Sequence, residues 1–566
     1  MARMDKFLTR RSKRQLSMDP IERKSRREVL KLAIGGAALL PGVAPAETGA
    51  SDHCASDAGA QRRWGHGIEG QRKADRGDGM FLNPILAGDY PDPSILKDGH
   101  NYYLTHSSFE ASPGLVIWHS RDLINWVPIC AALAAPLGTV FAVDLVKHDD
   151  RYYIYIPFMA ASWSTGLRAV ANIYVIHAPS ISGPWSDPID LDISGLIDPG
   201  HVVGEDGRRY LFLSGVSRVR LSKDGLATDG RVEKAYDGWD YPDSWITEAR
   251  SLESPKLLRK DGWFYLVSAE GGTGGPATGH MIIVARSRSV NGPWENCPHN
   301  PVVRTRSATE QWWSRGHATP VEGPGGAWYL VYHGYENGYR TLGRQTLLEP
   351  IEWTADGWFR ARGGDLSRPL PKPTNLTGLP HGVARSDDFS CPAFGTRWGF
   401  FGASPDEAHR TTFEQGTLVL SCKGTAPQDS SPLTQLVGDH AYEISVLLEL
   451  KGESEGGLLL FYNDRIFFGM GINGQKMTTY TAGRASFWKE PAPPARSLHL
   501  KIRNDRHVVT FYYGQDGVNW TRHGLRSETS GCHSNTIGSL ASLRPAIYAA
   551  GVGEVRFRNF IYSAKA

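Results

Sequence analysis

Short runs of aromatic and β-branched residues, separated by turns rich in Gly and Asp, recur along the chain from about residue 81. Residues 83–108 show the unit most clearly: an approach segment ends at Asp92, the run PSIL leads into the turn KDGH, and the run NYYLTHSS follows. Two such runs joined by a tight turn predict a β-hairpin. Asp and Pro are poor residues for a strand interior, so we expect Asp92 at the mouth of a strand, where its carboxylate is available for chemistry.

The same unit occurs five times between residues 81 and 372. Each copy begins with an acidic or polar residue, continues through a short strand and a turn, and ends in an aromatic strand; the first residues are 52, 54, 55 and 64 positions apart. A period of roughly 50 residues with several strands per unit predicts a five-bladed β-propeller. The five first residues are Asp92, Asp144, Asp198, Glu253 and His317.

Equivalent positions of the blades converge on the axis of a propeller, because the innermost strand of each blade lines the central channel. The pattern therefore predicts four carboxylates and one histidine around a single cavity. The alternative is that each acid only caps its own turn, as Asp often does. Because turn chemistry alone does not explain a register shared by five polar positions, we favour the cavity.

A second strand pattern begins after a stretch rich in Pro and Gly, and we interpret residues 373–385 as a linker. Runs such as GTLVLSC, YEISVLLEL, GGLLLFY and HVVTFYYG follow, with turns such as GQDGVNW between them and no five-fold repeat. This pattern predicts an antiparallel β-sandwich over residues 386–566. The chain as a whole is expected to be all-β, with a propeller followed by a sandwich.

The first 46 residues have the pattern of an export signal rather than of a folded segment. SRREVLK carries the pair Arg26 and Arg27, the apolar run LAIGGAALLPGV follows, and Ala44-Pro45-Ala46 supplies a small-x-small cleavage pattern. This resembles a twin-arginine signal and predicts a periplasmic or secreted protein. A membrane anchor is the rival interpretation, but a dozen weakly apolar residues are too few to span a bilayer.

The formal charge of +3 comes from this N-terminal segment. Residues 1–46 hold 11 Lys and Arg against 4 Asp and Glu, which leaves 51 basic and 55 acidic residues in the remainder, a formal charge of −4. The composition therefore gives no indication of a nucleic-acid partner. Residues 47–80 are polar and rich in Gly without periodicity, and we predict a disordered linker there.

The six cysteines include no CxxC pair, which makes a zinc site improbable. Disulfides are compatible with an exported protein, and Cys391 and Cys422 lie in the same C-terminal region. The sequence does not determine how any cysteines pair.

Two carboxylates on opposite sides of a pocket are what glycoside cleavage needs, one to protonate the leaving oxygen and one to activate water or attack carbon. We expect Glu253 to be the acid, because apolar neighbours and a nearby charge on Asp144 would raise its pKa. Asp92 is the expected base, and Asp144 would orient the acid. His317 and Arg344 are candidates for holding a metal ion or a sugar hydroxyl, with a structural role about as common for lone residues of this kind.

These residues carry a resemblance to the family 43 glycoside hydrolases, the β-xylosidase and α-L-arabinofuranosidase group. The opening YPDPSILKDGHNYYLTHSS is followed in the family's order by AVDL, IDP, ESPKLLRKDGWFYLVSAEGGT, GHA and LGRQT, over about residues 81–360. Residues 386–566 are similar to the concanavalin-like sandwich, of jelly-roll type, that in such β-xylosidases helps to close the active-site pocket.

The resemblance implies a five-bladed propeller that inverts anomeric configuration. It implies that Asp92 is the general base, Asp144 the orienting residue that adjusts a pKa, and Glu253 the general acid. His317 matches a histidine near a central calcium or sodium ion, and Arg344 an arginine that contacts the sugar. No organic cofactor is implied, and the expected partner is an oligosaccharide or polysaccharide.

Two departures from the family pattern concern the substrate. FEASPG stands where many β-xylosidases have FEWFPG, so that Phe109 remains as a candidate sugar contact while Ala111 and Ser112 stand in place of two aromatic residues. Phe141 and Val143 flank Asp144 where WAPDL is usual. The choice between xylose and arabinose, the choice between trimming ends and cutting internally, and the oligomeric state stay open. A sugar-binding propeller without catalysis is the alternative function; a retaining fructan-type hydrolase would need a different motif near the start.

Overall fold

The computed structural model describes residues 63–160, 171–391, 394, 396–486 and 495–565. The predicted export signal, residues 1–46, and the linker residues 47–62 lie outside this part of the chain. Within it, strands and short turns account for nearly all regular structure, and α1 (Ser534–Ile537) is the one α-helix. The short 3-10 helices are η1 (Ile68–Gly70), η2 (Ser214–Val216), η3 (Pro324–Gly326), η4 (Arg340–Leu342), η5 (Glu407–Arg410) and η6 (Pro427–Asp429).

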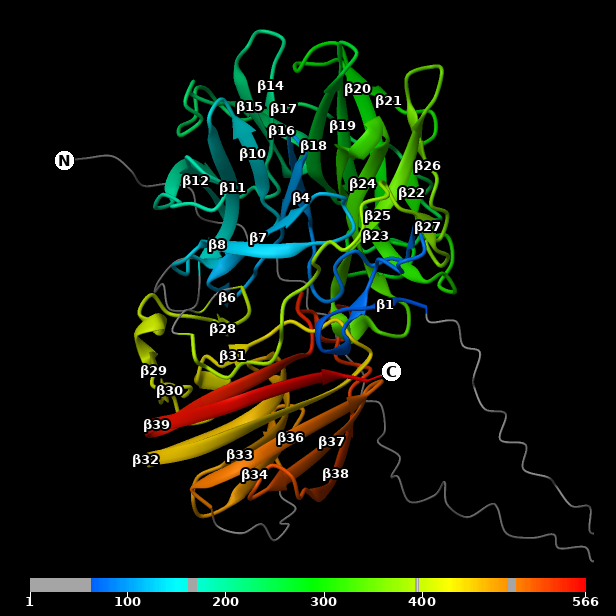
Figure 1. Ribbon diagram of the computed structural model, residues 1–566. Helices are drawn as coiled ribbons and strands as arrows, with labels where there is room; N and C mark the ends of the chain where they lie inside the picture. The colour runs from blue at the N-terminus through cyan, green and yellow to red at the C-terminus, as the bar shows by residue number, and fades with distance from the viewer. Residues whose placement is uncertain (1–62, 161–170, 392–393, 395, 487–494, 566) are drawn as a thin grey trace, which may run out of the picture. The chain divides into compact units, whose positions relative to one another are not determined.

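Five antiparallel sheets follow one another in chain order and form the blades of a propeller (Figure 1). The first two blades contain β4 (Ser94–Asp98), β5 (Asn101–Thr105), β7 (Gly114–Ser120) and β8 (Val127–Leu133), then β9 (Gly138–Val140), β10 (Asp144–His148), β11 (Arg151–Ala160), β12 (Ala171–Ala178) and β13 (Ile189–Ser194). The third contains β14 (Gly200–Val203), β15 (Arg209–Leu213), β16 (Ser217–Arg220) and β17 (Glu233–Lys234).

The fourth and fifth blades complete the ring. They contain β18 (Leu252–Lys260), β19 (Trp263–Glu270), β20 (Met281–Ser287), β21 (Glu295–Asn296) and β22 (Val303–Arg304), then β23 (Trp312–Glu322), β24 (Trp328–Glu336), β25 (Arg344–Trp353) and β26 (Phe359–Ala361). The first strands of the blades contact one another in a closed circle, β4 to β10, β14, β18, β23 and back to β4. The prediction of a five-bladed propeller is thereby confirmed, and these five strands are the innermost ones.

Burial of side chains along the strands explains why the blades pack, and β15 is buried at all of its residues. In β5, for example, Tyr102 and Leu104 are buried while Asn101 and Tyr103 are half-buried, as a strand with two different faces requires. Buried side chains of adjacent blades meet between the sheets, where Leu115 and Ile117 of the first blade join Ile154 of the second in one apolar cluster. The core of the propeller is therefore divided into clusters between blades, which leaves the axis free for polar side chains.

The prediction of a disordered linker is wrong for residues 63–80. β1 (Gly65–His66) pairs with β2 (Arg72–Lys73), and β3 (Met80–Phe81) pairs with β27 (Leu370–Pro371) at the other end of the propeller segment. Buried polar contacts explain why a stretch without apolar periodicity is ordered: Arg72 Nη1 lies 2.8 Å from the fully buried carboxylate of Glu336.

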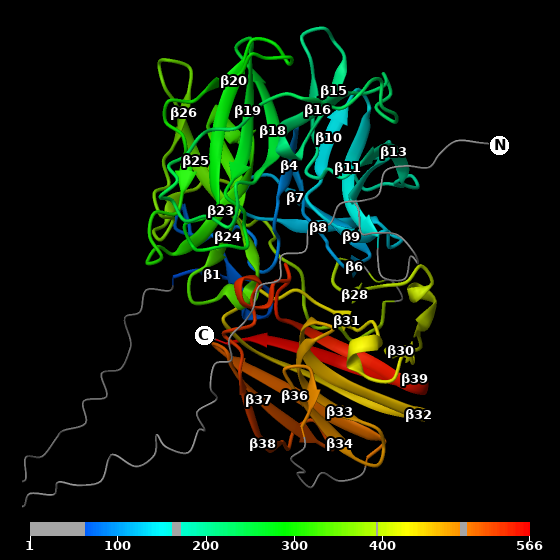
Figure 2. The same cartoon turned by 180° about the vertical axis from the view of Figure 1, so that it is seen from behind.

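The C-terminal region is a β-sandwich built largely on two long paired strands, β32 and β39. Its strands pack around one apolar cluster that includes Trp398, Leu448 and Phe557. The elements are β28 (Gly399–Phe401), β29 (Thr411–Phe413), β30 (Leu418–Ser421), β31 (Leu433–Thr434), β32 (Ala441–Asn463), β33 (Ile466–Ile472), β34 (Met477–Thr481), β35 (Arg484–Ala485), β36 (Ser497–Asp505), β37 (Val508–Gly514), β38 (Thr521–Glu528) and β39 (Arg544–Ala564) (Figure 2).

The departure from the family pattern at FEASPG has a structural counterpart. Ala111 and Ser112 form β6 (Ala111–Ser112), which pairs with β28 of the sandwich rather than standing free beside the axis. The two domains thus share a strand pairing at this point.

The five cysteines in the described ranges, including Cys391 and Cys422, are free, so the disulfide considered for that pair is not formed. In the same ranges, none of the helices has the length and apolarity needed to cross a bilayer.

Candidate active site

Four of the five predicted positions meet around the ring of His317. Its Nδ1 lies 3.4 Å from Asp92 Oδ1, and its Nε2 lies 3.4 Å from Asp198 Oδ2 and 3.9 Å from Glu253 Oε1. These residues come from four different blades: Asp92 and Asp198 lie just before β4 and β14, Glu253 is the second residue of β18, and His317 lies in the middle of β23. The convergence that the repeat predicts is therefore present for Asp92, Asp198, Glu253 and His317.

Unusual backbone conformations aim these side chains at the axis. Asp92, Asp198 and His317 have φ values of 56°, 56° and 60°, in the left-handed region that non-glycine residues seldom adopt. β18 departs from regular pairing just after Glu253, and β23 does so on either side of Gly316. Bulges of this kind turn a side chain out of its strand, and such strain is found mainly at functional sites.

Asp92 is held as a carboxylate. Its Oδ1 lies 3.0 Å from Arg344 Nη1, and its Oδ2 accepts a hydrogen bond of 2.6 Å from Ser107 Oγ. Burial alone would raise the pKa of this carboxyl, but the charges of Arg344 and His317 and a contact with His333 hold it well below its usual value. The group is therefore ionised throughout the working range of most enzymes.

The pKa of Glu253 is shifted in the opposite direction from that of Asp92. Burial raises its pKa to about 7, with the negative charges of Asp198 and Asp92 acting in the same direction and the charge of His317 and a hydrogen bond of 2.9 Å from Ser251 Oγ acting against it. Its side chain retains 17% of its exposure, so it can meet a ligand. Two carboxyl groups with pKa values pushed apart are the signature of an acid and base pair.

His317 is a cation at neutral pH. Burial alone would lower its pKa, but the charges of Asp92 and Asp198 outweigh that effect and raise it to about 9. In the protonated ring both nitrogens carry hydrogens, and they face the two carboxylates. His317 therefore ties Asp92 and Asp198 together and offsets part of the negative charge that crowds Glu253.

Asp144 does not lie beside the acid, which corrects the prediction that it orients Glu253. Its Oδ1 lies 2.7 Å from Lys256 Nζ, and its Oδ2 accepts the backbone N–H of His201 at 2.7 Å. Asp198, a position that the repeat identified without giving it a role, lies against His317 and acts on the Glu253 pKa instead. Asp144 and Asp198 occupy equivalent positions in the sequence repeat. Their roles differ because Asp144 is bound by Lys256 and His201.

Two further buried histidines complete the site, and sequence reasoning missed both. His333 Nδ1 accepts the backbone N–H of Asp92 at 3.1 Å, and its other nitrogen lies 3.0 Å from Thr273 Oγ1. His280 is fully buried, and its Nδ1 lies 3.7 Å from Glu253 Oε1. Single histidines in strands such as YLVYHG give no sequence signal that separates them from core residues.

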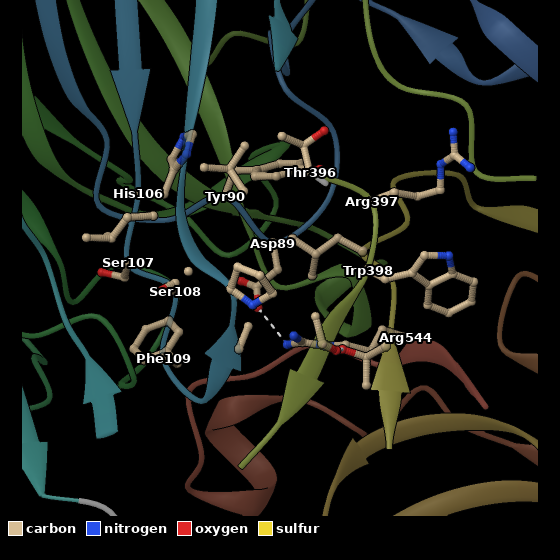
Figure 3. Close-up of a pocket in the computed structure, with 18 of the residues that line it drawn as sticks. Asp89, Tyr90, His106, Ser107, Ser108, Phe109, Thr396, Arg397, Trp398 and Arg544 are labelled. Carbon is tan, nitrogen blue, oxygen red and sulfur yellow. Dashed lines mark hydrogen bonds and ion pairs between the residues drawn. The ribbon is translucent and has the colours of Figure 1, made fainter. Parts of the chain in front are cut away.

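Arg344 and Phe109 lie together at the site, as expected of sugar contacts. The guanidinium of Arg344 lies 5.4 Å from the ring centre of Phe109, and its Nη2 is buried without a partner in the described residues. Phe109, Ser107 and Asp89 also line a pocket to which the sandwich contributes Trp398 and Arg544 (Figure 3). Asp92, Glu253, His317 and Arg344 do not line this pocket, which is connected to Asp92 through Ser107.

The residues that could hold a metal ion are Asp198, Glu253 and His317, whose ligand atoms lie within 4.8 Å of one another. The resemblance implies a calcium or sodium ion near this histidine. Calcium takes six to eight oxygen ligands, whereas these residues offer two carboxyl groups and one imidazole, so they would supply only part of its coordination. No chemical step is therefore assigned to a metal at these residues.

Comparison with known proteins gives matches over both domains. A model of the glycosyl hydrolases family 43 matches residues 81–359, and a model of the β-xylosidase C-terminal concanavalin A-like domain matches residues 386–539. A putative β-xylosidase of Escherichia coli K12 is 30% identical over 526 residues, which cover 78% of this chain and 90% of that protein.

Other relatives match over a shorter part. A xylan 1,3-β-xylosidase of Vibrio and a non-reducing end α-L-arabinofuranosidase of Bacteroides ovatus are each 31% identical, over 50% and 61% of this chain. The matched regions span only 57% and 65% of those two proteins. Among solved structures, a family 43 protein from Bacillus licheniformis superimposes with a TM-score of 0.76 at 27% identity, covering 86% of this chain and all of that one.

Proposed function

Because the chain belongs to glycosyl hydrolase family 43, we propose that it is an inverting glycosidase that acts on oligosaccharides derived from xylan. The observation that carries this proposal is the pair formed by Asp92 and Glu253, two carboxyl groups that face one imidazole from opposite sides with pKa values shifted in opposite directions. A propeller that only bound sugar would have no need of such a pair.

Asp92 is the general base in this proposal. Arg344 and His317 keep it ionised, so it can accept a proton from a water molecule placed below the anomeric carbon. Ser107 donates to its second oxygen and fixes the plane of the carboxylate. The proton moves from water to Asp92 while the water oxygen forms the new bond to carbon.

Glu253 is the general acid. With a pKa of about 7 it carries a proton over most of the neutral range and can pass it to the leaving oxygen as the glycosidic bond breaks. Asp198 takes the role first expected of Asp144, because its charge raises the Glu253 pKa and its carboxylate holds His317 in place.

The placing of the two acids supports inversion over retention. Inverting enzymes keep their carboxyls roughly 6.5–9.5 Å apart to admit a water, whereas retaining enzymes hold them about 5–5.5 Å apart. Here the imidazole of His317 stands between them, with contacts of 3.4 Å to Asp92 and 3.9 Å to Glu253. With this ring between them the two carboxyls are not in direct contact, and we infer the wider spacing of an inverting enzyme.

The substrate is proposed to be a terminal β-xyloside or α-L-arabinofuranoside, and the mode of action removal of end units. Relatives named for each of these activities are similar to this chain at the same level of identity. The sandwich comes close to the site, because its Trp398 and Arg544 line a pocket together with Phe109 and Ser107, and a neighbouring domain on one side favours the removal of end units over internal cleavage. Export through a twin-arginine signal to the periplasm or medium remains part of the proposal, supported by residues 25–46 of the sequence.

The test is hydrolysis of p-nitrophenyl β-xyloside and p-nitrophenyl α-L-arabinofuranoside, followed by NMR of the first-formed sugar anomer from xylobiose. We expect release from at least one aryl glycoside and α-xylose as the first product. Asp92→Asn serves as the inactive control on every substrate and Glu253→Gln as the control on xylobiose, and both substitutions keep side-chain size. Formation of β-xylose first would refute inversion, and no release from either glycoside or from arabinoxylan oligosaccharides would refute the hydrolase.

A further inference from the structure

A buried ion pair joins the sandwich to the segment that delivers Asp92. Asp89 lies in that segment, three residues before Asp92, and its Oδ2 lies 3.3 Å from Nη2 of Arg544, the first residue of β39. The exposed fractions of the two side chains are 5% and 9%. Figure 3 shows the two side chains meeting across the pocket, with the contact drawn as a dashed line.

The other oxygen of Asp89 holds the residue that contacts the base. Asp89 Oδ1 accepts the backbone N–H of Arg344 at 3.1 Å, and Arg344 Nη1 lies 3.0 Å from Asp92 Oδ1. Gly343 makes this approach feasible, because a Cβ at that position would lie 2.3 Å from Asp89 Oδ1 and its φ is +78°. The contacts thus run without a break from Arg544 through Asp89 and Arg344 to Asp92.

We infer that Arg544, a residue of the C-terminal sandwich, is a positioning residue for the water-activating acid of the propeller: it holds the Asp89 carboxylate, which fixes the backbone of Arg344 and with it the contact between Arg344 and Asp92. This inference rests on the proposed function. It makes the sandwich part of the catalytic apparatus at a defined point, in addition to its place beside the pocket.

Electrostatics explains why Asp89 depends on Arg544. Burial raises the pKa of Asp89, and the charges of Arg544 and Arg344 oppose that effect. Without Arg544, a buried carboxylate loses its partner and either takes up a proton or draws in water. A neutral Asp89 is a weaker acceptor for the Arg344 N–H, and the loop that carries Arg344 is then free to shift.

A plain clamp between domains is the competing explanation, and two other contacts nearby join the domains and provide a comparison. Ser534 Oγ lies 2.6 Å from Tyr335 Oη, and the backbone N–H of Leu543 donates to the Thr341 carbonyl at 2.8 Å. Neither contact touches Asp89. If Arg544 acts only as a clamp, losing it should resemble losing the Ser534 contact.

The experiment compares R544M, R544K and the double variant D89N/R544M with two controls. R397M removes an arginine that lines the same pocket but bonds to Asp387 (2.9 Å), and S534A removes an interdomain hydrogen bond. For each variant, kcat/KM is measured from pH 2 to pH 9, and the melting temperature is measured at each pH to confirm that the protein is folded.

We expect R544M to lower kcat/KM on the order of 10–100-fold, as a small misplacement of a catalytic group does. The acidic limb of the pH profile of kcat/KM should move to higher pH in R544M, because the charge of Arg344, which lowers the pKa of Asp92, is then farther from Asp92. R544K should recover much of the activity, and D89N/R544M should be no worse than R544M alone. R397M and S534A should keep the wild-type limb. The titratable groups that face Asp92 are Arg344 of β25, His333 of β24, His317 of β23, Glu253 of β18 and His106 after β5.

The inference is overturned if R544M is folded and keeps the wild-type kcat/KM and acidic limb. It is also overturned if S534A moves the acidic limb as far as R544M does. Either result leaves the proposed hydrolase activity intact. A crystal structure of R544M gives a readout that does not depend on activity. The distance from Arg344 Nη1 to Asp92 Oδ1 should lengthen from 3.0 Å, and an unchanged distance would contradict the positioning role even if the proposed function had failed.

Discussion

Lys256 Nζ lies 2.7 Å from Asp144 Oδ1, and both side chains are buried. The same ammonium donates to the carbonyl oxygens of Val143 and Pro199, each at 2.8 Å. Lys256 belongs to the fourth blade, and its three partners belong to the second blade and to the segment that enters the third. The pair therefore ties neighbouring blades together near the axis, and it neutralises the one repeat acid that is not part of the catalytic group.

Asp144→Asn and Asp198→Asn should for this reason have different effects. Asp144→Asn leaves the Lys256 ammonium buried without its counter-charge, which typically costs about 3–5 kcal/mol of stability. Asp198→Asn removes a charge that raises the Glu253 pKa, so the alkaline limb of kcat/KM should move to lower pH. Urea unfolding and pH–rate profiles separate the two effects. A stable Asp144→Asn variant with a displaced alkaline limb would return the orienting role to Asp144.

The wild-type pH profile follows from the two shifted carboxyls. Glu253 must carry its proton to act as an acid, and its pKa is about 7, so kcat/KM should fall as pH rises through about 7. Asp92 must lack its proton, and its pKa lies well below the ordinary value, so the acidic limb should lie below pH 4. The limbs belong to the coupled group formed with His317 rather than to single residues. Activity that stays level up to pH 9 would contradict this assignment of the acid, provided that the protein stays folded.

The leaving group provides a separate test of Glu253. In Glu253→Ala, an aryl glycoside with an acidic phenol as leaving group should retain much of its rate, because it needs little protonation. A xylobiose substrate should lose about 10²–10⁴-fold, the usual contribution of general acid catalysis. Asp92→Ala is the matched comparison and should impair both substrates alike, since water must be activated in either case. Equal losses for the two substrates in Glu253→Ala would exclude it as the proton donor.

The repeat in the sequence was sufficient to predict the propeller and the meeting of Asp92, Asp198, Glu253 and His317, because a shared register fixes where each blade aims its first residue. It was not sufficient to separate Asp144 from Asp198. That distinction depends on Lys256, which comes from another blade and has no mark in the local pattern.

The prediction of disorder for residues 63–80 failed for a related reason. The order of residues 63–80 depends on partners far along the chain, such as Glu336 for Arg72 and Lys372 for Asp75, and composition alone does not reveal them. The ion pair between Asp89 and Arg544 joins residues 455 positions apart and is equally invisible in the sequence. The local sequence pattern thus predicted the strands and where they begin, whereas ion pairs between residues distant in the sequence determined the role of each acidic residue.

Gly316 should tolerate no larger residue, because the ring of His280 occupies the space beside it. A Cβ on Gly316 would lie 1.3 Å from His280 Cδ2, and His280 is fully buried and cannot move aside without disturbing its neighbours. Overpacking of this kind costs about 1–3 kcal/mol or more, so Gly316→Ala should lower stability by at least that amount.

The same substitution should also lower kcat, since His280 Nδ1 lies 3.7 Å from Glu253 Oε1 and a displaced ring would press on the acid. Gly531→Ala is the control, because a Cβ there meets nothing within 4 Å and its φ is not in the left-handed region. Urea unfolding together with kcat on an aryl glycoside measures both effects. A Gly316→Ala variant as stable and as active as Gly531→Ala would show that the axis beside Glu253 is less tightly packed than this structure requires.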